Sequence, residues 1–88
     1  MGSDEVRRSA ARIQQIGDDV RRLADRTLTA GAAQWRSTAA AGFRHRLIDE
    51  VARIRAVAAE LDRAAEALLR HAGALDRMIA RFDFGGSR

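Results

Sequence analysis

Apolar residues along this 88-residue chain repeat with helical spacing in two long segments. The first segment has a seven-residue pattern whose core positions are Val6, Ser9, Ile13, Ile16, Val20, Leu23, Thr27 and Ala30. The second carries an apolar residue at every seventh position without interruption: Ala40, Leu47, Ile54, Leu61, Leu68, Leu75 and Phe82. Such spacing is typical of amphipathic helices. It predicts a helix over 4–29, a turn over 30–37 and a second helix over 38–82.

Capping residues support these boundaries. Ser3 or Asp4 suits the N-cap of the first helix, and Ser37 or Thr38 suits that of the second. Two consecutive glycines follow the last apolar position, and glycine commonly ends a helix. We therefore expect residues 85–88 to form a flexible tail.

The width of the apolar stripe indicates a bundle. Beside the seven-residue row of the second helix lie further apolar positions: Phe43, Val51, Val57, Ala58, Ala65, Ala72, Met78 and Ile79. This stripe is broader than the seam of a two-stranded coiled coil. We expect an all-α fold with a single domain over 1–84, in which an antiparallel helical hairpin pairs with another hairpin into a four-helix bundle.

The two predicted helices differ in length, at about 39 and 67 Å for a rise of 1.5 Å per residue. The first would cover the second only to about Arg63 and leave the later apolar residues, Ala65 and Ala72 among them, without a partner in the chain. A break near Gly73 would let the second helix fold back, but the heptad phase runs through Gly73 unchanged, which favours a second chain. The predicted partner interface comprises Leu61, Leu68, Leu69, Leu75, Ile79 and Phe82.

Composition narrows the class of protein further. The chain has no cysteine, so disulfides and thiolate metal sites are excluded. It also has no proline, so no residue of this type interrupts a long helix. Its 16 basic residues, all arginine, outnumber 12 acids and give a net charge of +4. The stretch around the predicted turn, residues 26–47, is basic. It contains no acid and carries Arg26, Arg36, Arg44, His45 and Arg46.

This basic stretch raises an alternative function, association with nucleic acid or with an anionic membrane surface. Elsewhere the arginines alternate with acids, which is typical of a solvated, charge-balanced face and does not favour nucleic-acid binding. No apolar run approaches the roughly 20 residues of a membrane span, and no signal-peptide pattern is present at the start. We expect a cytoplasmic protein, exported, if at all, without a signal peptide.

The predicted helical hairpin does not place together the residues that catalysis, metal binding or cofactor binding would need. His45 and His71 are far apart, and metal ligation needs three or four converging donors. No nucleophile with a base, no glycine-rich phosphate loop and no substrate pocket is predicted, so we expect no enzymatic activity and no cofactor. His71 and Glu50 flank the apolar stripe, where polar residues commonly tune helix pairing.

The segment "WRSTAAAGFR", which contains the single tryptophan Trp35 followed by Ser37 and Phe43, lies at the predicted turn. A helical hairpin with a tryptophan at its turn resembles the Trp-X-Gly (WXG) family of small bacterial type VII, or ESX-like, secretion substrates. Ser37 stands where that family has glycine. Trp35 is expected either to close the open end of the hairpin by packing on Leu28 or Phe43, or to form a groove with a partner, and the two roles are compatible.

The resemblance implies a secreted substrate, adaptor or chaperone-like partner that forms a homodimer or a heterodimer with a related helical protein, and that accompanies a larger secreted effector. Many relatives carry a Tyr-X-X-X-Asp/Glu export signal after the second helix. In this chain Asp83 has Ile79 four positions before it, and tyrosine is absent. The resemblance therefore implies a chain whose dimer partner supplies the signal.

Overall fold

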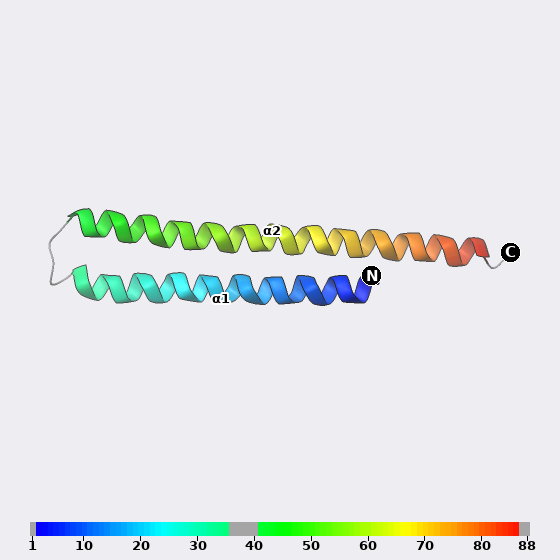
Figure 1. The fold of residues 1–88 in the computed structure, drawn as a ribbon, viewed down its shortest axis with the longest axis horizontal. Coiled ribbons are helices and arrows are strands. Elements are labelled where there is room, and N and C mark those ends of the chain that lie inside the picture. The colour runs from blue at the N-terminus through cyan, green and yellow to red at the C-terminus, as the bar shows by residue number, and fades with distance from the viewer. Residues whose placement is uncertain (1, 36–40, 87–88) are drawn as a thin grey trace.

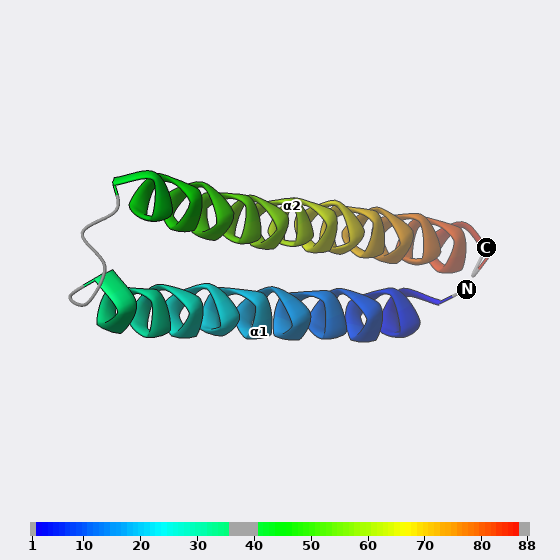
Figure 2. The same ribbon diagram turned by 60° about the vertical axis from the view of Figure 1, so that its left-hand side comes forward.

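Two long antiparallel helices make up the protein in a computed structural model that describes residues 2–35 and 41–86 (Figure 1). The first, α1, spans Ser3–Trp35, and the second, α2, spans Ala41–Gly86. A second view keeps the two helices alongside each other over most of the length of α1 (Figure 2). The all-α class and the helical hairpin predicted from the sequence are confirmed.

Both helices extend beyond the predicted boundaries. α1 continues through residues 30–35, which were expected to form the turn, and α2 continues to Gly86 rather than ending near 82. Alanines dominate this end of α1, and alanine has the highest helix propensity. Thr27 and Thr29 direct their hydroxyls to backbone carbonyls four residues earlier, at 2.8 and 2.9 Å, so neither hydroxyl competes with the helix.

The contact between the helices consists mainly of small residues at every seventh position. We call these buried residues the inner row: Ala10, Gly17, Ala24 and Gly31 in α1, and Val51, Ala58, Ala65 and Ala72 in α2. A Cβ built on Gly31 would overlap the outer carbons of Leu47, so the helices approach closely there. Val6 is the largest side chain that is fully buried.

This inner row corrects the interface expected within the hairpin. The large apolar residues of the predicted seam in α1 lie mostly at the edge of the contact, and Ile16 and Leu23 are exposed. Small residues occupy the space between the helices instead, because only they allow the backbones to come this close. The larger residues are therefore left on one open side of the hairpin.

The helices are paired further along α2 than predicted. Arg7, near the start of α1, makes an ion pair with Asp76, and Ala65 and Ala72 are buried against α1. The expectation that the apolar residues past Arg63 have no partner in the chain is therefore wrong for these two alanines. The error arises because α1 extends to Trp35 instead of ending at residue 29, so each residue of α1 lies opposite a later residue of α2 than expected.

The far end of α2 projects past α1, as Figure 1 shows. Ile79 is the next residue at the seven-residue spacing of the inner row, yet it is exposed, and Phe82 is 80% exposed. α2 remains one continuous helix through Gly73, so it does not fold back to cover this end. The molecule is an elongated rod with dimensions of 76 × 15 × 13 Å.

Candidate interaction surface

One open side of the hairpin is formed by the residues that flank the inner row, most of them apolar. We call it the apolar face. In α1 it comprises Val6, Ser9, Ile13, Ile16, Val20, Leu23, Thr27 and Ala30, the eight positions of the first predicted pattern. In α2 it comprises Phe43, Leu47, Glu50, Ile54, Val57, Leu61, Ala64, Leu68, His71, Leu75, Met78 and Phe82. Helical spacing and the antiparallel arrangement place both sets on the same side of the plane of the two helix axes.

The apolar face has two levels of burial. Positions next to the inner row are half-buried in the hairpin, among them Ile13, Leu61 and Leu68, and Val6 is fully buried. Positions further out are mostly exposed: Val57 is 52% exposed and Met78 57% exposed. A continuous row of exposed, large apolar side chains along two helices is characteristic of a protein interface.

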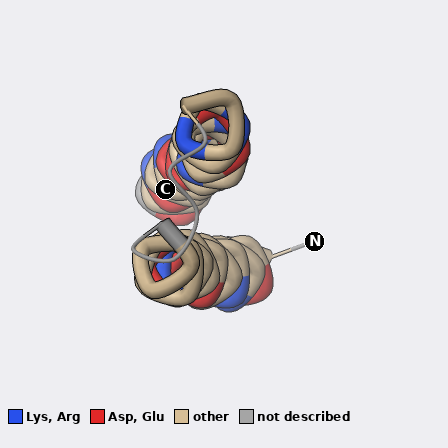
Figure 3. Tube along the Cα trace, turned by 90° about the vertical axis from the view of Figure 1, so that its left-hand side faces the viewer, with Lys and Arg blue, Asp and Glu red and all other residues tan. Residues whose placement is uncertain are grey.

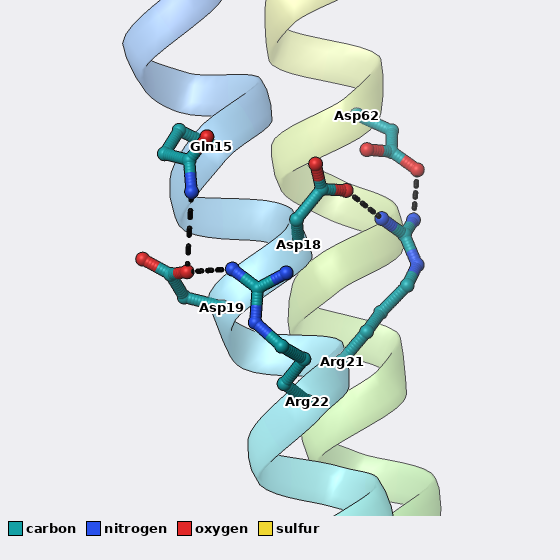
Figure 4. Close-up of polar contacts among 6 residues, drawn as sticks. All are labelled: Gln15, Asp18, Asp19, Arg21, Arg22 and Asp62. Carbon is teal, nitrogen blue, oxygen red and sulfur yellow. Dashed lines mark hydrogen bonds and ion pairs between the residues drawn. The ribbon is translucent and has the colours of Figure 1, made fainter.

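The opposite side is held by ion pairs between the helices, and we call it the ion-pair face. Arg7 pairs with Asp76, Arg21 pairs with Asp62, and Arg55 donates to Asp25 at 3.2 Å. In Figure 4, Arg21 also reaches Asp18 on its own helix, at 3.5 Å. These side chains are more than 40% exposed and remain hydrated, so each pair contributes little to stability, although the pairs show which residues lie opposite each other.

The ion pair between Arg7 and Asp76 changes the pKa of both groups. The hydrogen bond from the Arg7 guanidinium, with a smaller contribution from Ser3, holds the pKa of the Asp76 carboxyl below its ordinary value. The same contact raises the pKa of Arg7. Both groups are charged at neutral pH, so this part of the ion-pair face is polar.

The structure separates the predicted interface residues between the two faces. Leu61, Leu68 and Leu75 are half-buried on the apolar face, and Phe82 continues this face beyond α1. Ile79 extends the inner row past the end of α1. Leu69 lies on the ion-pair face, one position away from Leu68.

The predicted turn motif is described only in part. Trp35 is the last residue of α1, Phe43 is half-buried in the first turn of α2, and Ser37 lies outside the described residues. The predicted caps Ser37 and Thr38 also lie outside them. The sequence pattern placed the α2 half of the inner row within the apolar stripe but did not identify the α1 half, although its signal was present as four small residues spaced by seven.

The hollows on the described part of the surface include two with apolar linings. One, near the turn end, is lined by Leu28, Ile48, Val51, Ala52 and Arg55, which places Ile48 on the ion-pair face beside Arg55. The other is on the projecting end of α2 and is lined by Ala74, Arg77, Met78, Arg81 and Phe82. The second hollow is open to solvent and largely apolar.

The turn end of the rod is basic. Figure 3, viewed from this end, shows basic residues on the first turns of α2. Within the described part of the chain, Arg26, Arg44 and Arg46 form no ion pair. Their charges are thus accessible from solvent.

Over residues 2–35 and 41–86, no group of three or more metal-ligating side chains lies together, and neither helix has a stretch apolar enough to cross a bilayer. Searches of protein-family models, curated proteins and solved structures found no match to this chain.

Proposed function

We propose that the protein is a non-enzymatic interaction protein whose apolar face packs against a helical partner to complete a four-helix bundle. The observation that carries this proposal is the contrast between the two sides of the hairpin. The ion-pair face is closed by charged residues that bridge the helices, whereas the apolar face presents two rows of mostly apolar side chains on each helix. Four-helix bundles are built from such faces.

The exposed area of the hairpin supports the need for a partner. The chain has 6539 Å² of accessible surface, whereas a compact monomer of 9.7 kDa is expected to have about 5,100 Å². The difference, about 1,400 Å², exceeds the roughly 800 Å² that each partner buries in a standard interface. A complex through the apolar face would remove this excess and stabilise both helices.

Two matched substitutions test the proposal. Val57 and Ile48 lie on α2 with nearly equal exposure, 52% and 51%, but on opposite faces. Arginine at either position is accommodated in the hairpin, because both side chains already reach solvent. Val57→Arg is expected to abolish the complex, seen as a fall in mass by light scattering, while Ile48→Arg leaves it intact. Equal effects of the two variants, or none from either, would contradict the role of the apolar face.

For the biological role we propose a substrate, adaptor or chaperone-like partner in type VII secretion, supported by the hairpin form and by Trp35 at the end of α1 beside the turn. In this role the dimer accumulates in the cytoplasm, and its partner or a larger effector provides the export signal. Co-purification of the untagged chain tests it. Recovery of a related helical protein, a secreted effector or a component of the export machinery is expected.

The basic turn end supports a second candidate function, binding to an anionic surface such as nucleic acid or a membrane. Accessible arginines at one end of a rod would make phosphate contacts there. Binding of this kind weakens steeply with added salt, whereas helix packing through the apolar face does not. A salt titration therefore distinguishes the two candidates.

A further inference from the structure

We infer that the partner on the apolar face is a second copy of this chain. It packs antiparallel, α2 on α2 and α1 on α1 about one two-fold axis, and Glu50 of each copy lies beside His71 of the other. This inference rests on the proposed function and identifies the occupant of its surface. Four features of the chain lead to it.

The first feature is the projecting end of α2. If two α2 helices pair antiparallel along their full length, the turn end of one covers the projecting end of the other. Apolar-face residues then form layers in which Phe82 meets Phe43 of the second copy, Met78 meets Leu47 and Leu68 meets Val57. The hollow lined by Met78 and Phe82 receives Phe43. The two-fold axis passes between Asp62 and Arg63.

The second feature is the placement of charge on the apolar face. Among its described residues Glu50 and His71 are the ionisable ones, and they lie on either side of this axis along α2. The same register puts Glu50 opposite Leu75 of the second copy, one helical turn from its His71. The symmetry creates two such contacts. Glu50 now accepts a hydrogen bond from Arg53 at 2.8 Å, but both side chains are mostly exposed and free to rearrange.

The third feature is that α1 obeys the same symmetry. Antiparallel pairing of two α1 helices about Asp18 places Ile16 opposite Val20 and Ser9 opposite Thr27. The two polar residues that α1 contributes to the apolar face then lie opposite each other. Within the hairpin, a Cβ built on Gly17 would lie within 3.7 Å of Leu61 and Asp62, while Arg21 pairs with Asp62. Asp18 of α1 and Asp62 of α2 therefore lie at one level, and a single axis serves both helix pairs.

The fourth feature is the difference in helix length, which argues against parallel packing. In a parallel two-fold dimer, each α2 crosses the shorter α1 of the other copy. The projecting ends, with Phe82 80% exposed, would then extend past both α1 helices. Antiparallel packing covers both ends.

A charge exchange tests the proposed contact. His71→Glu would place two carboxylates together at each contact and is expected to weaken dimerisation about tenfold. Adding Glu50→Arg to this variant should restore the dissociation constant to within about threefold, because opposite charges face each other again. Glu66→Arg, an exposed change outside the apolar face, is the control and should have no effect. Analytical ultracentrifugation measures all four proteins.

Orientation is tested by cross-linking, since the natural chain has no cysteine. A Phe43→Cys, Phe82→Cys double variant, treated with a short bis-maleimide, is expected to yield dimers linked from position 43 to position 82. Links from 43 to 43 or from 82 to 82, or failure of the charge exchange to restore the dimer, would overturn the antiparallel contact and leave the proposed function standing. A chain that is monomeric alone but binds another helical protein through Val57 would overturn self-pairing only. A monomer that binds no helical protein would refute the proposed function itself.

Discussion

Alanine substitution of Gly17 and Gly31 tests whether the inner row sets the distance between the helices. Both glycines are buried in α1 at equivalent positions of the seven-residue repeat. A Cβ on Gly17 would lie 3.3 Å from an oxygen of the Asp62 side chain and 3.7 Å from the Leu61 Cβ. A Cβ on Gly31 would overlap Leu47, which is itself half-buried.

The two substitutions should therefore have different effects on the free energy of unfolding. Replacing a helical glycine by alanine gains about 1 kcal/mol of helix propensity. At Gly17 little opposes this gain, because the end of the Asp62 side chain can shift. At Gly31 the added methyl displaces Leu47, and overpacking of this kind costs about 1–3 kcal/mol. We expect Gly31→Ala to be less stable than Gly17→Ala by about 1–3 kcal/mol.

Urea unfolding followed by circular dichroism measures this difference. Gly73→Ala serves as a control for helix propensity, because its Cβ would meet only the end of the Arg77 side chain, at 3.5 Å. Measurements at several protein concentrations separate hairpin stability from association. If Gly31→Ala were stabilised as much as Gly17→Ala and Gly73→Ala, the close approach at Leu47 would be refuted.

Three further predictions concern charge and the turn. Because Arg7 lowers the pKa of Asp76 in the folded protein, this carboxylate stabilises the fold at pH values above its unfolded pKa. The stabilisation is lost as the pH falls through the lower folded pKa. Thermal melts at a series of pH values should show that Asp76→Asn removes this part of the acid dependence. Trp35→Ala should retain helicity by circular dichroism but weaken partner capture in a pull-down, and outright unfolding would place Trp35 in the core instead. Arg44→Ala with Arg46→Ala should leave the dimer mass unchanged, and should reduce retention on heparin only if the basic end binds anions.

The sequence by itself determined the helices and their apolar character. Alanine and arginine are strong helix formers, and proline is absent, so both segments favour helix before any tertiary contact is considered. The seven-residue spacing of Leu47, Ile54, Leu61 and Leu68 also identified the apolar face of α2. It could not locate the end of α1, since residues 30–35 carry helix-forming alanines together with a glycine that equally suits a turn.

Only the tertiary structure decided which apolar row each helix buries. Large residues and small residues both recur at the spacing that an amphipathic helix needs, so periodicity alone favoured the larger ones. In the hairpin, Ala10 and Gly17 pack between the helices because a short side chain lets two backbones approach, while Ile16 and Leu23 are left outside. The position of Arg7 opposite Asp76, and with it the length of α2 that projects beyond α1, depends on this close packing and is not encoded in either helix alone.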